Sequence, residues 1–365
     1  MMNIKRNTRN GVSGIMRVKN DAEFIAASID SCIDALDELI IVYNDCSDNS
    51  PDIIEQKRCQ YPDKIKAYEY KHKIYSINLT KEEYDYAKSL PADSPHLLCN
   101  YYNFALSKVT CKYAMKVDAD QIYFTEKLRM WCDVFRSKPD SFSLKVLIGG
   151  IVWAMSRIRL KWAIKKGSLL PFPSRNTSAK LWPLYQAFLK YWVHKKHVAV
   201  SMSGADVVRQ GNEWYVTMGK RNDIINILPP YNGVGDHLIF EVSEKTYYVV
   251  DDCEFYRKLR SESYSLIERF VCPFKSYYAG VFWYHLNAMR DNVKERVAEA
   301  HKVYPDYFVS VEKFVNLDYD KQISPKMDKE MVAPTHSWQF QAVHQFDSNE
   351  ITKNIHLINN INRKQ

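Results

Sequence analysis

The spacing of apolar residues alternates between two patterns at the start of the chain. Residues 12–18 and 38–43 are short apolar runs, and the second is rich in β-branched side chains, as buried strands are. Residues 22–36 repeat apolar side chains at intervals of three and four, and residues 51–59 follow a polar turn, so both are predicted helices. This order of strand and helix predicts an α/β fold with a doubly wound, mostly parallel sheet.

The same reading continues along the chain. It predicts a loop at residues 76–95. Further strands are predicted at 66–70, 113–117, 141–151, 198–203 and 246–250. Further helices are predicted at 97–107, from residue 125 and at 291–303.

Two carboxylates follow the apolar strand at 113–117. Asp118 and Asp120 are separated by one residue, so along an extended strand they project to the same side. Two like charges this close repel each other and favour a cation between them. Carboxylate oxygens without thiolate or imidazole neighbours suit Mg²⁺ or Mn²⁺. Such a pair also occurs in ordinary solvated turns, so only the residues around it can indicate whether it binds a metal ion.

Polar residues follow the two earlier strands as well. Arg17 and Asn20 come at the end of the first strand, and Asp45 and Asp48 come after the second. In parallel sheets ligands bind beyond the carboxyl ends of the strands. We therefore expect these residues and the Asp-x-Asp pair to gather at one edge of the sheet.

These segments resemble the GT-A nucleotide-sugar glycosyltransferases, in particular the family 2 group of bacterial sugar transferases. The resemblance covers residues 10–125. It rests on MRVKND at 16–21, YNDCSDNS at 43–50, NYYN at 100–103 and VDAD at 117–120. The family usually carries Asp where this sequence has Asn44, so the contact to the nucleobase is less firmly expected than the metal site.

The resemblance implies a GT-A fold and transfer of a sugar from a nucleotide diphosphate sugar, by default a UDP-sugar. The acceptor would be a saccharide or lipid-linked saccharide, with inversion at the anomeric carbon, in the cytoplasmic assembly of a bacterial surface polysaccharide. Arg17 and Asn20 would line the nucleotide pocket, with Asp45 on the base or ribose. Asp48 and Asn103 would belong to the same nucleotide-sugar site. Asp118 and Asp120 would bind Mn²⁺ or Mg²⁺ at the diphosphate.

Later residues complete this expected site. The resemblance implies a small-residue turn at residues 204–209 that shapes the floor of the sugar site, and Asp206 within it is expected to contact the donor sugar. Asp236, expected at a helix start after a glycine turn, is the candidate catalytic base, although Asp there is equally an ordinary helix N-cap. His285 is the candidate third metal ligand, and the alternative is a buried structural histidine. His336 is a second candidate for that position.

Residues 153–197 form a basic aromatic insertion within the predicted catalytic domain, residues 1–245. The insertion has no acidic residue, and its Trp, Tyr and Phe residues lie among Arg157, Arg159, Lys161, Lys165, Lys166, Arg175, Lys180, Lys190, Lys195 and Lys196. This composition suits contact with an anionic membrane. An insertion that buries its aromatic residues is the alternative, while single-stranded nucleic acid is disfavoured because a nucleotide pocket already explains the preference for anions. An acceptor-side region at 246–330 and a tail at 331–365 are expected to follow.

The composition of the chain indicates its cellular compartment, and its motifs weigh against two alternative functions. The net charge of +8 favours anionic partners, and eight scattered cysteines without zinc spacing favour a reducing cytoplasm. We expect no signal peptide, and the longest uncharged apolar run, 146–156, is too short to span a bilayer. A sugar-phosphate nucleotidyltransferase would need a glycine-rich loop that residues 16–20 lack. A non-catalytic glycan- or membrane-binding protein is a further alternative, although the intact Asp-x-Asp pair speaks against it.

Overall fold

The computed structural model describes residues 9–138, 141–166, 175–219, 227–233, 236–251, 264–323, 340–341, 343–359 and 361. The chain forms two compact units. Unit 1 comprises Met1–Ala119 and Ile239–Lys275, and unit 2 comprises Asp120–Leu238 and Ser276–Gln365. Each unit therefore combines stretches that are distant in sequence. The domain boundaries expected at residues 245 and 330 follow the order of the sequence and do not coincide with these units.

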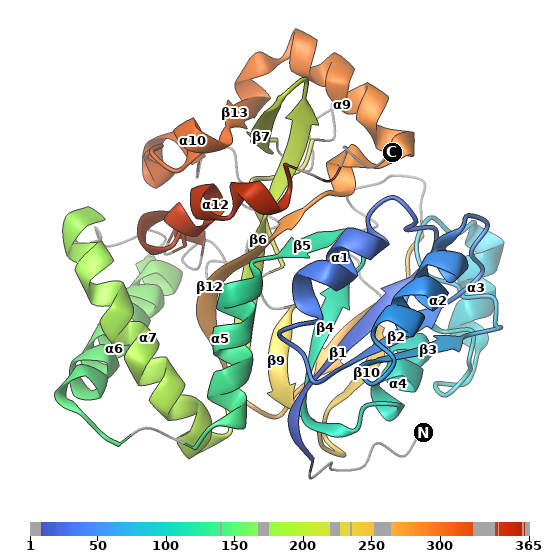
Figure 1. Ribbon diagram of the computed structural model, residues 1–365, viewed down its shortest axis with the longest axis horizontal. Coiled ribbons are helices and arrows are strands. Elements are labelled where there is room, and N and C mark those ends of the chain that lie inside the picture. The colour runs from blue at the N-terminus through green and yellow to red at the C-terminus, as the bar shows by residue number, and fades with distance from the viewer. Residues whose placement is uncertain are drawn as a thin grey trace. The chain divides into compact units, whose positions relative to one another are not determined.

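The core of unit 1 is a parallel sheet with the strand order β3-β2-β1-β4 (Figure 1). Its strands are β1 (Arg9–Val18), β2 (Glu38–Tyr43), β3 (Ile65–Glu69) and β4 (Cys111–Asp118). The three neighbouring pairs are parallel, and β9 (Leu238–Glu241) pairs with β4 in the antiparallel sense. The order 3-2-1-4 is that of the first half of doubly wound nucleotide-binding folds. The predicted α/β class with a mostly parallel sheet is confirmed.

The helices of unit 1 follow the prediction except in one segment. They are α1 (Ile25–Cys32), α2 (Ser50–Gln60), α3 (Lys81–Ser89) and α4 (Leu98–Ser107). The loop predicted at residues 76–95 is wrong, because this stretch contains α3. The Thr80 hydroxyl accepts a hydrogen bond from the Glu83 backbone N–H, and the Glu83 carboxylate accepts one from the Thr80 N–H. This capping box stabilises a helix that has few apolar residues to mark it in the sequence.

A small antiparallel sheet completes unit 1. It consists of β10 (Tyr247–Asp251) and β11 (Ile267–Val271), and α4 packs against both strands. A minor core of buried residues from α3 and its surroundings lies beside it and contains Leu79, Tyr84, Ala87 and Leu266. These contacts hold residues 264–266 against α3 and the residues around it.

Unit 2 is built on the parallel pair β6 (Ala199–Gln210) and β12 (Ser276–His285). The remaining strands pair in the antiparallel sense, and they are β5 (Gln121–Tyr123), β7 (Glu213–Thr217), β8 (Tyr231–Asn232) and β13 (Phe308–Ser310). The strand predicted at 198–203 is confirmed, but the small-residue turn predicted after it is wrong. Residues 204–209 continue β6, so Asp206 projects from a central strand.

The strand predicted at residues 141–151 is also wrong, because Leu144–Lys166 form the helix α6. It packs side by side with α7 (Arg175–Lys196) as a helical hairpin (Figure 1). Gly149 permits this contact, since a Cβ atom there would lie 2.0 Å from the Leu184 carbonyl oxygen. Apolar residues occupy both the packed face and the exposed face of this part of α6. The sequence therefore lacks a clear helical period and resembles a strand. Within the described residues, no helix combines the length and the apolar character needed to cross a membrane.

The other helices of unit 2 surround its sheet. They are α5 (Thr125–Arg136), α9 (Asp291–Val303), α10 (Val311–Phe314) and α12 (Asn349–Lys353). The short turns are η1 (Asn287–Met289), η2 (Pro305–Tyr307), the π-helical η3 (Tyr319–Ile323) and η5 (Ile355–Leu357). The helices predicted from residue 125 and at 291–303 are confirmed.

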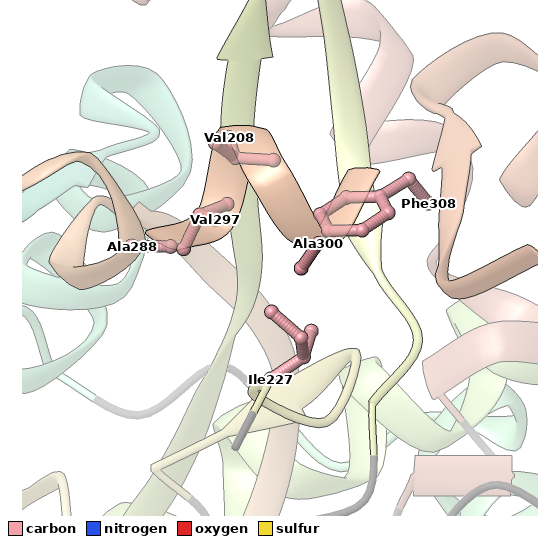
Figure 2. Close-up of a cluster of buried hydrophobic side chains, with 6 residues drawn as sticks. All are labelled: Val208, Ile227, Ala288, Val297, Ala300 and Phe308. Carbon is pink, nitrogen blue, oxygen red and sulfur yellow. The ribbon is translucent and has the colours of Figure 1, made fainter. Parts of the chain in front are cut away.

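A hydrophobic cluster fixes η1 and α9 on β6. Figure 2 shows its buried members, which are Val208, Ile227, Ala288, Val297, Ala300 and Phe308. Ala288 lies in η1, and Val297 and Ala300 form the buried face of α9. Because η1 is held by this core, His285 before it and Arg290 after it occupy defined positions.

One glycine of β6 makes a contact that permits no side chain. Gly204 pairs with Trp283 of β12, and a Cβ atom there would lie 1.9 Å from the Trp283 Nε1 atom. We expect Gly204→Ala to lower the free energy of unfolding by about 1–3 kcal/mol, because the fully buried indole has no room to move. Thermal unfolding of both proteins measures this. Gly211→Asn is the control, since Gly211 has open space around it and Asn tolerates its positive φ of 61°. An unchanged melting temperature in Gly204→Ala would contradict the prediction.

Candidate active site

Polar residues end three neighbouring strands of unit 1, as the sequence predicted. Arg17 and Asp118 are direct partners in the parallel pair of β1 and β4. Asn20 follows β1 and Asp45 follows β2, and both have positive φ, of 56° and 47°. These four residues therefore lie at the carboxyl edge of the same sheet, which is the edge that binds ligands in parallel α/β folds.

Asn20 and Asp45 also connect the two loops at this edge. The Asn20 Oδ1 atom accepts a hydrogen bond from the Ser47 backbone N–H at 2.7 Å. Lys19 Nζ lies 2.8 Å from Asp45 Oδ2, and this exposed hydrogen-bonded pair holds the pKa of Asp45 below its usual value. Asp45 is thus an ionised, accessible acceptor next to β2, as a contact to a ribose or base requires.

Asp48 and Asn103 instead bind the backbone of their own unit. The two carboxylate oxygens of Asp48 accept hydrogen bonds from the N–H groups of Ala22 and Ser50, each at 3.0 Å. Burial raises the pKa of Asp48, but these donors lower it overall. The Asn103 amide both donates to and accepts from the Tyr248 backbone at 2.8 Å. Asp48 positions a loop and Asn103 positions β10, and their contact with a nucleotide sugar stays a prediction.

Two cations accompany Asp118 in unit 1, the half-buried Arg17 and the buried Lys116. The Arg17 guanidinium carbon lies 3.7 Å from the centroid of the Tyr102 ring, and its Nε atom is buried without a hydrogen-bond partner among the described residues. The Lys116 Nζ atom lies 4.0 Å from Asp118 Oδ1 and 3.9 Å from Glu268 Oε1. This edge of the sheet therefore presents two positive charges and an aromatic ring beside a partly exposed carboxylate.

Sequence reasoning missed Lys116 and Glu268. Lys116 precedes Asp118 by two residues on β4, so the two-residue period of a strand places both side chains on one face. That signal was available in the sequence. Glu268 lies in β11, far along the chain, and nothing local marks it.

In unit 2, His285 lies between two carboxylates. Its Nδ1 atom is 2.5 Å from Asp206 Oδ1, and its Nε2 atom is 3.5 Å from Asp120 Oδ2. Burial lowers the pKa of His285, but the charges of Asp120 and Asp206 and the hydrogen bonds to them raise it to about 10. His285 is consequently an imidazolium cation at neutral pH.

Arg290 and Asn232 extend this network and were missed from the sequence. Arg290 Nη2 donates a hydrogen bond of 2.8 Å to Asp120 Oδ2. Asn232 Nδ2 donates at 2.8 Å to Asp206 Oδ1, and its carbonyl accepts from Trp283 Nε1 at 3.1 Å. Two carboxylates are thus balanced by His285 and Arg290. The position of Arg290 five residues after His285 was the only local hint of its role.

The three predicted metal ligands belong to different units, because Asp118 lies in unit 1 whereas Asp120 and His285 lie in unit 2. Asp120 accepts a hydrogen bond from Arg290, and His285 Nε2 lies 3.5 Å from the Asp120 carboxylate. Across the part of the chain that the structure describes, no group of three or more His, Cys, Asp or Glu residues is arranged to hold a metal ion. A requirement for Mn²⁺ or Mg²⁺ at Asp118, Asp120 and His285 therefore stays a prediction. His336 lies outside the described residues.

Asp236 does not begin a helix. Its N–H donates to the Gly233 carbonyl at 3.1 Å, and the described residues after it lead directly into β9. The helix predicted there is wrong, and the N-cap alternative fails with it. The Asp236 side chain is 51% exposed, with Oδ2 3.5 Å from His237 Nδ1. Its carboxylate is accessible, and its role as a base stays a prediction.

Comparison with known proteins supports the resemblance found in the sequence. Residues 7–148 match a family model described as beta-1,4-N-acetylgalactosaminyltransferase (CgtA). This segment runs from β1 through α5 and includes every motif on which the resemblance to nucleotide-sugar glycosyltransferases rests, so the match confirms that resemblance. A search of curated proteins finds no matching sequence.

Several solved structures align over much of the chain. Staphylococcus aureus TarS, residues 1–349, is 11% identical, covers 97% of this chain and 90% of its own, and gives a TM-score of 0.32. Its complex with UDP is 13% identical, with the same coverage and TM-score. Mycobacterium tuberculosis glucosyl-3-phosphoglycerate synthase, with Mn²⁺, UDP and glucosyl-3-phosphoglycerate, is 11% identical over 50% of this chain and 80% of its own, with a TM-score of 0.23. At such TM-scores these structures carry no weight for the site.

Proposed function

We propose that the protein is a glycosyltransferase that moves a sugar from a nucleotide diphosphate sugar to a saccharide or lipid-linked saccharide. The supporting observation is the glycosyltransferase match of residues 7–148, the stretch whose strand ends carry Arg17, Asn20, Asp45 and Asp118. UDP as the nucleotide, inversion, and a place in the cytoplasmic synthesis of a bacterial surface polysaccharide are the finer parts of this proposal. They follow from the resemblance alone.

The carboxyl edge of the unit 1 sheet is the proposed nucleotide site. The half-buried Arg17 guanidinium supplies one positive charge, and Lys116 adds a second charge beside Asp118. Charge-assisted hydrogen bonds from such groups bind phosphate oxygens strongly. Asp45 is the exposed acceptor for ribose or base hydroxyl and N–H groups.

The transfer itself needs a base and a stabilised leaving group. The acceptor oxygen forms a bond to the anomeric carbon while the bond from that carbon to the diphosphate oxygen breaks. The electron pair stays on the diphosphate, and the acceptor proton passes to a carboxylate, for which we propose Asp236. Its exposed carboxylate can accept a proton, whereas Asp206 is buried and already bonded to His285 and Asn232.

A panel of nucleotide sugars tests this proposal. Release of free nucleotide diphosphate is measured with Mn²⁺, with Mg²⁺ and with a chelator, for the wild type and for Asp118→Asn. We expect the wild type to hydrolyse one donor slowly. In Asp118→Asn the rate of this hydrolysis should fall by about 100-fold or more, because the carboxylate beside Lys116 is neutralised. Asp85→Asn is the matched control, since Asp85 is an exposed residue of α3 in the same unit. We expect the control to keep the wild-type rate.

Asp236→Asn separates catalysis from binding. We expect this variant to bind the hydrolysed donor with unchanged affinity but to lose transfer, because only the proton acceptor is removed. Donor binding without cleavage under every condition would indicate the non-catalytic binding protein instead. A chain that binds no donor at all would exclude the proposed class.

A further inference from the structure

We propose that one face of α6 is a docking surface for an anionic lipid bilayer. This surface, the α6 apolar face, consists of Leu144, Leu147, Ile151, Met155, Ile158 and Trp162. The inference lies beyond the transferase activity and does not rest on it, because every observation that carries it belongs to the α6–α7 hairpin of unit 2.

The residues of the α6 apolar face are large, apolar and exposed. Their exposed fractions lie between 45% for Trp162 and 70% for Leu144. They recur at intervals of three and four residues along α6, so at 3.6 residues per turn they lie within an arc of about 80°. An apolar stripe of this length on a helix surface is typical of an interaction site rather than of scattered surface residues.

The opposite face of α6 is already used within unit 2. Trp153 packs on Phe188 of α7, with ring centroids 5.8 Å apart, and Gly149 lies against Leu184. α7 in turn is fixed to β12, because the Tyr185 hydroxyl donates to the Tyr278 carbonyl at 2.7 Å. The α6 apolar face is therefore exposed on a helix whose other side is firmly packed.

A shallow apolar groove adjoins the stripe. It has a volume of about 230 Å³ and is lined by Phe142, Val146, Leu147, Gly150, Ile151, Ala154, Phe188, Tyr191 and Trp192. No charged side chain lines it. A groove of this composition can hold a segment of a lipid acyl chain while the adjoining α6 apolar face contacts the bilayer.

Charge decides which partner fits this surface. The sequence from residue 141 to residue 205 contains no Asp or Glu. Among the hairpin lysines whose exposure the structure describes, five are exposed, namely Lys145, Lys165, Lys180, Lys195 and Lys196. Lys165 continues the apolar stripe three residues after Trp162. Basic residues beside an apolar helix face are attracted to anionic headgroups while the face enters the interfacial layer.

The same charges argue against other partners. A second copy of the hairpin would bring two uniformly positive surfaces together, which costs free energy. Single-stranded nucleic acid would need aromatic side chains on which bases stack, but five of the six stripe residues are aliphatic or Met. Since no described helix can cross a bilayer, the expected mode is binding parallel to the membrane surface.

Vesicle flotation with the full chain tests the inference. Vesicles of phosphatidylcholine alone are compared with vesicles that also contain phosphatidylglycerol. We expect the wild type to bind the anionic vesicles preferentially and the double variant Met155→Glu/Ile158→Glu to bind at least about tenfold more weakly. Lys145→Gln/Lys165→Gln should weaken binding by about fivefold per residue.

Val303→Glu is the matched control, because Val303 is an apolar residue of α9 with 56% exposure in the same unit. It should bind as the wild type does, and all variants should keep the wild-type melting temperature because the changed residues are exposed. Equal binding of wild type and double variant, or no preference for anionic vesicles, would overturn the inference. A wild-type dimer that the double variant dissociates, measured by light scattering, would assign the face to a second copy. Donor hydrolysis in vesicle-free buffer is recorded in parallel, so failure of membrane binding and failure of the proposed activity are distinguished.

Discussion

Asp120→Asn is expected to lower sugar transfer by about 100- to 1,000-fold. The Asp120 carboxylate is the shared acceptor of Arg290 at 2.8 Å and of the imidazolium of His285 at 3.5 Å. An amide of the same shape leaves both cations in place with only Asp206 to balance them. The rate of nucleotide diphosphate release, with the hydrolysed donor, measures the effect.

The same substitution should also destabilise unit 2, and a second variant separates the two effects. Removing one partner of a largely buried ion pair costs about 3–5 kcal/mol, and we expect roughly 2 kcal/mol here because Arg290 is 25% exposed. In Asp120→Asn/Arg290→Gln the unbalanced charge is gone, so stability should recover while activity stays low. Activity that recovers together with stability would show that Asp120 acts only by holding the fold.

Glu38→Gln is expected to remove about 3 kcal/mol of stability from unit 1 at neutral pH. Glu38 begins β2, and its side chain is 1% exposed. Its carboxylate accepts hydrogen bonds from Lys66 Nζ at 2.8 Å, from the Ser13 hydroxyl at 2.6 Å and from the Thr110 N–H at 2.6 Å. Burial raises the pKa of Glu38, but these donors lower it from 4.5 to about 2.

The sign of this shift fixes the pH dependence. The unfolded carboxyl group binds a proton below pH 4.5, whereas the folded one binds it only near pH 2. The stabilisation is therefore complete above pH 4.5 and is lost as the pH falls towards 2. Hydrogen exchange of the β1, β2 and β4 amides, at neutral pH and at about pH 3, measures it within unit 1.

Glu55→Gln provides the control for the Glu38 prediction. Glu55 is paired with Arg58 on the surface of α2 and is 55% exposed. Exposed pairs contribute at most about 1 kcal/mol, so its loss should have little effect at either pH. If the β1, β2 and β4 amides were equally protected from hydrogen exchange in Glu38→Gln and Glu55→Gln, the role assigned to Glu38 would be contradicted.

The sequence predicted those parts of the fold whose signals are local. β1, α1, β2 and α2 were predicted because apolar spacing and a polar turn mark each of them within a few residues. α3 was missed because its capping box, not an apolar face, stabilises it. α6 was predicted in part as a strand because its apolar residues fill both the packed face and the exposed one, which hides the helical period.

The candidate site was predicted residue by residue but not as a network. Asp206 and His285 were assigned separate roles from the sequence, whereas they are direct partners across β6 and β12. That register depends on pairing between strands that are far apart in the chain, and no local pattern encodes it. Asn232 joins from β8 for the same reason.

Because each unit combines segments that are distant in sequence, some paired strands are synthesised long before their partners. β4 is synthesised with unit 1, but its antiparallel neighbour β9 emerges only after the unit 2 segment that runs from β5 to β8. Until then one edge of β4 offers unpaired backbone groups to any other nascent chain. Truncated translation products that stop before β9 should therefore be the species that chaperones retain and proteases remove.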